Sequence, residues 1–158
     1  MNKSILAGSL HFVDGQVAHS SRAIEKDDDM GLRGLLVVHG IVTLAAAVIL
    51  TVAPGLIPRI VRIHLEPSAY LMAYLLAAAE FGLSSLSFGG SQLTDLQALR
   101  LISWTCVVFH VSSGLFEVRA YMEGVSTAVL GNVVARGLII ALFLYFLRSR
   151  AALAAKQA

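Results

Sequence analysis

The chain has 158 residues, of which 57% are hydrophobic and only 14% are charged, and its mean hydropathy is +0.77. These values lie far outside the usage of soluble globular domains, and they indicate a single-domain integral membrane protein. The formal charge of +2 is small, and its basic residues stand mainly beside the ends of apolar runs. Basic residues in such places contact anionic lipid, so the predicted partner is the lipid bilayer and not a nucleic acid.

Residues 1–30 differ from the rest because they are polar and end in an acidic run. This composition predicts a disordered tail. We reject a cleaved signal peptide, since the apolar stretch after Lys3 is interrupted by polar residues and lacks a small-x-small cleavage site. Met30 opens directly into the first apolar run, so Met1 and Met30 are both candidate translation starts.

Four apolar runs are long enough to cross about 30 Å of hydrocarbon at about 20 residues each. The predicted spans are residues 34–56, 68–88, 99–118 and 126–147. They belong to a transmembrane domain of residues 31–150, and residues 151–158 are predicted to be a cytoplasmic tail. The runs lack the alternating pattern of outer-membrane strands, so helices must satisfy the backbone. The predicted fold class is therefore an all-α integral membrane protein, a four-transmembrane-helix bundle of up-down topology, because short loops make sequential helices antiparallel.

Proline and glycine indicate the helix boundaries. Pro54 and Pro58 should end the first span, and Pro67 should precede the second. Gly89 and Gly90 should close the second span.

The distribution of Lys and Arg predicts the orientation. The N-terminal segment, the second loop and the C-terminal tail together carry Lys3, Arg22, Lys26, Arg33, Arg100, Arg148, Arg150 and Lys156. The first and third loops carry only Arg59, Arg62 and Arg119. This excess of eight to three predicts a multi-pass protein of the cell inner (plasma) membrane with both termini in the cytoplasm.

Two ionisable residues, Glu80 and Arg136, stand in the middle of long apolar runs. A lone charged residue at the centre of a membrane helix costs roughly 2.5 to 3.5 kcal/mol on insertion scales, so each needs a protein partner or water. The simplest prediction is that the two side chains pair with each other.

Depth in the membrane groups further polar residues with this pair. At 1.5 Å per residue from each span's midpoint, Glu80, His110 and Arg136 fall within about 2 Å of one level. By the same measure His39 lies about 7 Å toward the cytoplasm and Asn132 about 7 Å toward the outside. These five residues form the predicted intramembrane polar cluster.

One face of the third span carries small and polar residues at three- and four-residue steps. These residues are Ser103, Cys106, His110, Ser113 or Gly114, and Glu117. Similar faces on the other spans should meet inside the bundle. Cys106 has no second cysteine to pair with and is predicted to be a small buried side chain. Glu117 and Arg119, near the outer interface, are predicted to be a solvated helix end.

Other chemistries fit the sequence less well. His39 and His110 differ by about 9 Å in estimated depth, which does not suit the two axial positions of one haem. A metal site of His39, Glu80 and His110 has suitable ligand types but no diagnostic spacing. The chain has no phosphate-binding glycine loop and no nucleophile motif. The sequence therefore predicts no catalytic residue, no metal and no cofactor, and it does not favour an enzyme.

The first span contains the sequence VVHG, with His39 and Gly40, and the second ends in AAAEFGLSSLSFGG, with Glu80 and Gly82. A polar third span and a short fourth follow. Over residues 34–147 this arrangement resembles the small bacterial four-helix membrane proteins of the DoxX-like type. The resemblance implies a bacterial inner-membrane protein and transfers no catalytic residue.

Two functions are consistent with these patterns. The favoured one is a non-enzymatic accessory or structural membrane subunit, in which the polar cluster fixes helix register and the partner is a second copy or another membrane protein. The alternative is a small transporter or proton-coupled carrier that uses Glu80 and His110 at the bilayer midplane. Water access to Glu80 distinguishes the two, because a carrier needs an aqueous path to this residue.

Overall fold

The computed structural model describes residues 31–157, and the regular structure in this part of the chain is entirely helical. In chain order the elements are a first helix, Gly31–Val52, then α2, Leu56–Ile60, the 3-10 turn η1, Pro67–Ala69, α3, Tyr70–Gln92, α4, Leu96–Met122, and α5, Val129–Gln157. The first helix and α3 to α5 are long and apolar enough to cross a membrane. This confirms the predicted all-helical class and its four apolar helices, while the predicted N-terminal tail lies outside the described residues.

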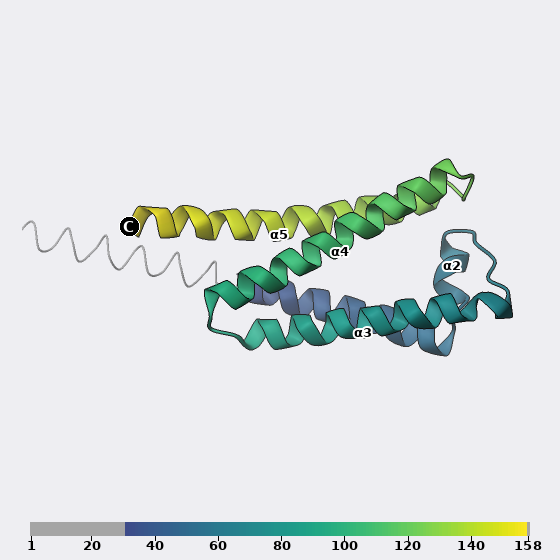
Figure 1. Ribbon diagram of the computed structural model, residues 1–158, viewed down its shortest axis with the longest axis horizontal. Coiled ribbons are helices and arrows are strands. Elements are labelled where there is room, and N and C mark those ends of the chain that lie inside the picture. The colour runs from purple at the N-terminus through teal and green to yellow at the C-terminus, as the bar shows by residue number, and fades with distance from the viewer. Residues whose placement is uncertain (1–30, 158) are drawn as a thin grey trace, which may run out of the picture.

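Consecutive long helices run in opposite directions and form two hairpins (Figure 1). The first helix packs beside α3, where the Ser84 hydroxyl donates to the Gly40 carbonyl at 3.0 Å. α4 and α5 form the second hairpin, and α4 runs at an angle to α3 and diverges from it toward the α2 end. The described part of the chain therefore begins and finishes at the same end of the molecule, and α5 continues into the predicted C-terminal tail.

The two hairpins share a core only at the end where the described chain begins and finishes. Side chains of the first helix, α4 and α5 form this core, namely Leu32, Leu36, Leu99, Ile102, Cys106, Val107 and Phe143. A smaller cluster at the α2 end, Leu50, Ala73 and Ala77, joins the first helix to α3, and Ile57 of α2 and Leu65 pack against it. Cys106 is a fully buried free thiol in the main core, as predicted.

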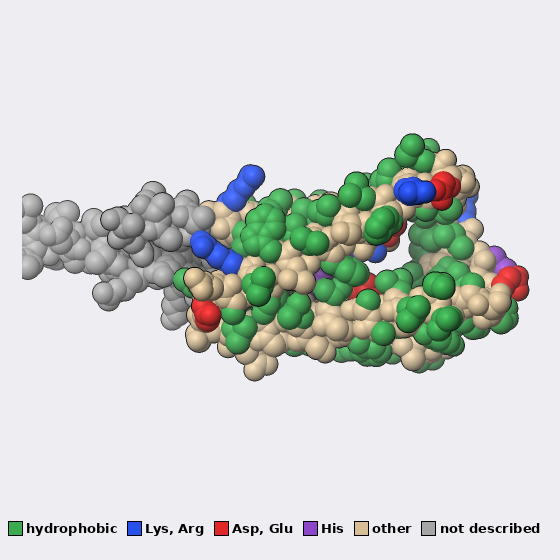
Figure 2. Space-filling view, in the orientation of Figure 1, with side chains coloured by type: hydrophobic (Ala, Val, Ile, Leu, Met, Phe, Trp, Pro, Cys, Tyr) green, Lys and Arg blue, Asp and Glu red, His purple; other side chains and the backbone are tan. Residues whose placement is uncertain are grey.

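Burial along the helices confirms that the second hairpin is uncovered toward α2. His110 is the last buried residue of α4, and no residue of α5 from Leu130 to Leu142 is buried. Figure 2 shows an open hollow in this region, between α3 and the α4–α5 hairpin, with acidic and basic side chains at its inner edge. We call this space the hollow.

The first helix ends at Val52, four residues before the predicted boundary. Pro54 causes this early end, because its ring disfavours the helical conformation at Ala53 and it has no N–H to donate. The shorter helix moves the midpoint of the first span toward its N-terminus, and this changes the estimated depth of His39.

Gly89 and Gly90 do not close the second span, contrary to the prediction, because α3 continues to Gln92. A Cβ atom on Gly90 would lie 3.0 Å from Cδ1 of Ile102 and 3.1 Å from its Cγ2, so this glycine permits close packing of α3 on α4. A Cβ atom on Gly89 would have no other atom within 4 Å. The two glycines therefore differ in role although they are adjacent.

The turn between α4 and α5 does require a glycine. Gly124 has a φ of 98°, a backbone angle that residues with a side chain rarely adopt. The Val125 N–H donates to the Ala120 carbonyl at 3.0 Å, in the pattern of a Schellman C-cap. This compact turn keeps α4 and α5 together as a hairpin.

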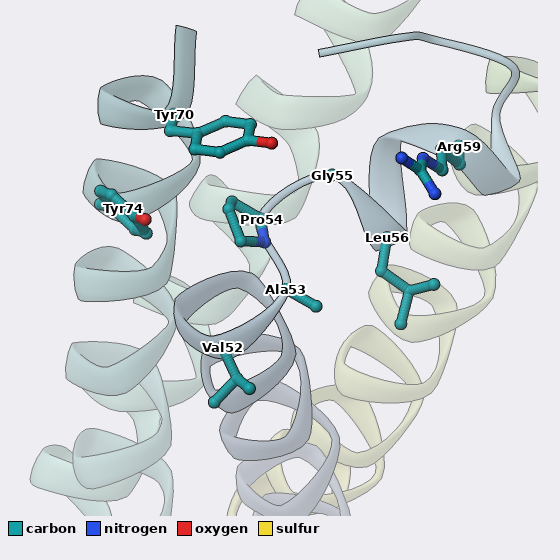
Figure 3. A pocket seen from close by; sticks show the side chains of 8 residues that line it. All are labelled: Val52, Ala53, Pro54, Gly55, Leu56, Arg59, Tyr70 and Tyr74. Carbon is teal, nitrogen blue, oxygen red and sulfur yellow. The ribbon is translucent and has the colours of Figure 1, made fainter. Parts of the chain in front are cut away.

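A separate pocket of about 460 Å³ lies where the first helix, α2 and α3 meet (Figure 3). It is lined by Val52, Ala53, Pro54, Gly55, Leu56, Arg59, Tyr70 and Tyr74. None of the residues of the predicted polar cluster lines it, so the candidate site must be sought in the interior of the bundle.

Candidate functional site

Two histidines join the hairpins at the inner end of the hollow. His39 lies on the first helix and His110 on α4, and their Nε2 atoms are 2.9 Å apart. The rings are nearly perpendicular, with centroids 5.1 Å apart, and the residues are only 4% and 5% exposed. On its other side His39 contacts Ser87 of α3, with Nδ1 and Oγ 2.8 Å apart. A continuous polar path therefore runs from α3 through the first helix to α4.

The direction of these hydrogen bonds follows from Arg136, because a guanidinium can only donate. Its Nη1 lies 3.2 Å from Nδ1 of His110, which must therefore accept. Neutral His110 then carries its proton on Nε2 and donates to Nε2 of His39. His39 in turn carries its proton on Nδ1 and donates to Ser87 Oγ. Each ring nitrogen thus has one partner when both imidazoles are neutral.

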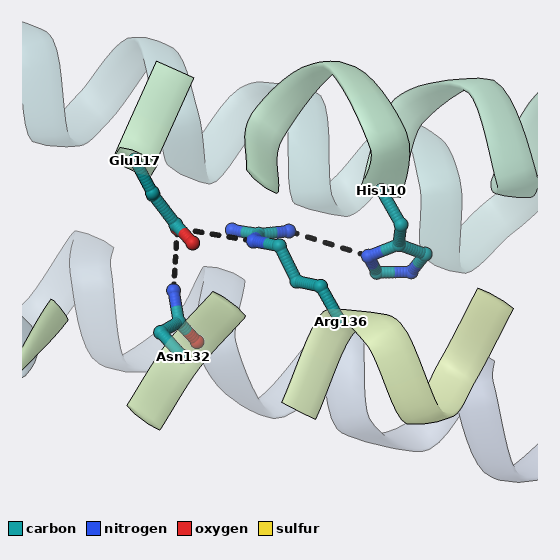
Figure 4. A network of polar contacts seen from close by, with 4 residues as sticks. All are labelled: His110, Glu117, Asn132 and Arg136. Carbon is teal, nitrogen blue, oxygen red and sulfur yellow. Dashed lines mark hydrogen bonds and ion pairs between the residues drawn. The ribbon is translucent and has the colours of Figure 1, made fainter. Parts of the chain in front are cut away.

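Arg136 and Asn132 lie one turn apart on α5 and both hold Glu117 of α4 (Figure 4). Nε of Arg136 donates to Oε1 of Glu117 at 3.0 Å, and Nδ2 of Asn132 donates to the same oxygen at 2.5 Å. The side chains of Arg136 and Glu117 are only 14% and 21% exposed. The Arg136 guanidinium also lies 5.9 Å from the centroid of the Phe109 ring, at a distance typical of a cation–π contact.

We call the connected set Ser87, His39, His110, Arg136, Glu117 and Asn132 the polar chain. It brings together four of the five predicted cluster residues, from three helices. The prediction did not include Ser87 or Glu117. The spacing of seven residues from His110 to Glu117 places both on one face of α4, so the helical period contained the signal for Glu117.

The fifth predicted residue, Glu80, lies apart from the polar chain. It is 8% exposed on the inner face of α3, and among the side chains of residues 31–149 its carboxylate has no hydrogen bond and no ion pair. The predicted direct pair with Arg136 is not formed, because the Nε and Nη1 atoms of Arg136 are bonded to Glu117 and His110. Glu80 is therefore a buried carboxylate without a direct partner.

The depth estimate was wrong for His39. It separated His39 and His110 by about 9 Å on the basis of straight, parallel helices at 1.5 Å per residue, whereas the two rings are in contact. The early end of the first helix accounts for part of this error, and the tilt of α4 in Figure 1 adds to it.

Of the two charged residues predicted to form a solvated end of α4, only one is in solvent. Arg119 is exposed and pairs with Glu123 one turn away at 2.9 Å, as a solvated helix end should. Glu117 is instead mostly buried and holds α4 to α5. The difference arises because Glu117 faces α5 and Arg119 does not.

The geometry of the histidines bears on metal and haem binding. The two Nε2 atoms that would be free to bind a metal are bonded to each other. Glu80 is not bonded to either ring, and within residues 31–157 no three His, Cys, Asp or Glu side chains are grouped as metal ligands. The arrangement is suited to hydrogen-bonded contacts and to holding charge inside the bundle.

Comparisons with protein-family models, with curated proteins and with solved structures found no match for this chain. The functional conclusion therefore depends on the geometry of the site.

Proposed function

We propose that the four long helices span a lipid bilayer, with both chain ends in the cytoplasm and the α2 end on the opposite side. Large apolar side chains on the outer faces of the helices support this, for example Leu71, Val108 and Leu138, which are 59%, 60% and 63% exposed. Apolar surface on this scale is a liability in water and is the normal surface of a helix in lipid. The bias of Lys and Arg supports the orientation, and the DoxX-like resemblance supports a bacterial inner membrane.

Within the membrane, we propose that the protein is a small carrier that binds a polar solute in the hollow. The observation that carries this proposal is Glu80, a buried carboxylate without a direct partner beside an open space. A residue that only fixed helix register would be expected to have a hydrogen-bonding partner, because an uncompensated buried charge costs several kcal/mol. The hollow gives this carboxylate an approach from the α2 end.

The polar chain supplies the closed end of such a site. His39 and His110 join the two hairpins below the hollow, and the main apolar core lies beyond them. In this conformation a solute from the α2 side would reach Glu80 and Arg136 and would be stopped at the histidine pair. A carrier of this kind must then open the histidine contact to release the solute on the other side.

Cysteine labelling tests whether water reaches the hollow. Gly114 lies on α4 between His110 and Glu117, and a Cβ there would meet nothing closer than Cδ of Arg136 at 4.0 Å. In a Cys106→Ala background, Gly114→Cys should react with a charged, membrane-impermeant thiol reagent added from the α2 side. The matched control is Gly137→Cys, which follows Arg136 in sequence, is exposed on α5 and meets nothing within 4 Å.

The control should not react, because a thiol facing lipid has no water in which to ionise. Equal reaction at both positions would show that the reagent enters the bilayer and does not report the hollow. If Gly114→Cys is unreactive from either side, the interior is dry and the carrier proposal fails.

The accessory-subunit function has one specific observation in its favour, namely that the inner faces of α4 and α5 are uncovered beyond His110. A helix of a second copy or of another membrane protein could fill this space. Such a partner would protect Gly114→Cys from the reagent in native membranes, and protection would be lost after purification of the single chain. Reaction at the same rate in both preparations would rule out this function.

A further inference from the structure

Two acidic residues, Glu80 of α3 and Glu117 of α4, lie on the α2 side of the histidine pair. Ser87 of α3 and His110 of α4 lie at one level because His39 bonds to both. Glu80 is seven residues before Ser87, and Glu117 is seven residues after His110. Because α3 and α4 are antiparallel, both steps of about 10.5 Å lead toward the α2 end. Glu80 and Glu117 therefore both lie on the α2 side of the histidine pair, one on α3 and the other on α4.

Both carboxylates have acceptor atoms without a donor. Oε1 of Glu117 accepts from Arg136 and Asn132, but its Oε2 is buried and has no hydrogen-bond partner. Glu80 has none among the side chains of residues 31–149, although it is more than nine-tenths buried. Buried acceptors are nearly always satisfied in folded proteins, so the unsatisfied Oε2 of Glu117 indicates that a donor is missing. The Glu80 carboxylate, which has no partner among the described side chains, is free to accept one.

The charges around the hollow indicate the sign of the charge that a ligand should carry. With both carboxyl groups ionised, Glu80 and Glu117 contribute two negative charges, Arg136 contributes one positive charge, and His39 and His110 are neutral in the polar chain. The sum is one negative charge in a region of low dielectric, where an unbalanced charge is costly. A ligand with one positive charge balances it.

We propose that the hollow binds a small organic ammonium ion at the Glu80 carboxylate, with Glu117 as the second acidic group of the site. This inference depends on the proposed carrier function and names its solute class. An ammonium group offers N–H donors to a small number of carboxylate oxygens. Calcium instead takes six to eight oxygen ligands, and magnesium requires six in octahedral geometry. An anion would meet the Glu80 carboxylate, while Arg136 is already bonded to Glu117 and His110.

Thermal unfolding of the purified protein in detergent tests this assignment with methylammonium as the probe. A ligand that binds only the folded protein raises the midpoint temperature as its concentration rises. Methylammonium should raise this temperature for the unmodified chain, whereas tetramethylammonium, which has the same charge but no N–H donor, and sodium should not. A stabilisation that is equal for the three cations would overturn the proposal.

Glu80→Gln removes the charge and keeps the shape of the side chain. It should weaken methylammonium binding at least about tenfold, because a charge-assisted hydrogen bond is lost. The matched control is Glu123→Gln, which removes an exposed carboxylate on the outer end of α4 and should leave the binding curve unchanged. Glu80→Gln should fold at least as well as the parent, since it removes a buried charge that has no direct partner.

Equilibrium binding of radiolabelled methylammonium gives a second measurement that does not depend on unfolding. Unchanged binding by Glu80→Gln in this assay would overturn the proposal. The two proposals fail separately. An unreactive Gly114→Cys shows that the hollow is closed and contradicts the carrier, whereas a reactive Gly114→Cys without methylammonium binding contradicts only the ammonium ligand.

Discussion

The ion pair between Glu117 and Arg136 should couple α4 to α5, and a double-mutant cycle measures this coupling. Breaking a fully buried pair costs about 3 to 5 kcal/mol, and this pair is slightly accessible, so we expect about 1 to 3 kcal/mol for Glu117→Gln. Arg136→Gln should cost more, because it also removes the donor to His110. The loss of stability in the double variant should be smaller than the sum of the losses in the two single variants by about 1 to 3 kcal/mol, because neither charge is left without its partner.

The assay is the free energy of unfolding of the four proteins under one set of detergent conditions. The control cycle is Arg119 with Glu123, an exposed pair on the same helix whose side chains are 77% and 62% accessible. Exposed pairs of this spacing contribute about 0.3 to 0.5 kcal/mol, so this cycle should be nearly additive. Additive losses for Glu117 and Arg136, or strong coupling of Arg136 to Glu80 in a third cycle, would refute the pairing seen here.

Two other substitutions test the packing and the polar chain. Gly90→Ala should destabilise the fold by about 1 to 3 kcal/mol, because its Cβ would overlap Ile102, whereas Gly89→Ala should be neutral or slightly stabilising in the same helix. Equal effects at the two glycines in thermal unfolding would contradict the close contact of α3 and α4. His39→Leu should cost about 1 to 3 kcal/mol, since it leaves His110 with an unsatisfied buried donor. A loss below about 0.5 kcal/mol, the effect of an ordinary surface substitution, would show that the histidine contact is unimportant for folding.

Hydropathy was sufficient to predict the helices because each apolar run is long and has few charges. It did not predict their ends equally well. Pro54 ends the first helix at once, since the restriction that proline imposes is local to the backbone. Gly90 does not end α3, because its missing side chain serves the contact with Ile102 on another helix. Whether a glycine ends a helix or permits a contact depends on neighbours that are distant in sequence.

The residues of the polar chain were largely identifiable, but their pairing was not. Ionisable side chains in apolar runs need partners, and this requirement pointed to Arg136 and His110 of the polar chain and to Glu80, which lies outside it. The choice of partner depends on helix tilt, which side-chain periodicity does not contain. The estimate of depth treated the helices as parallel, so it separated His39 from His110 and placed Glu117 in solvent.

The connectivity of the chain explains why Arg136 pairs with Glu117 and not with Glu80. The short turn at Gly124 holds α4 and α5 together along the part of the hairpin that contains Glu117, Asn132 and Arg136. α3, which carries Glu80, diverges from this hairpin toward the α2 end, and the hydrogen bonds of the guanidinium go to Glu117 and His110. The divergence that leaves Glu80 without a direct partner is also the one that opens the hollow. A buried carboxylate and an open approach to it therefore have one structural cause, and this common cause supports the proposed carrier over a purely structural role.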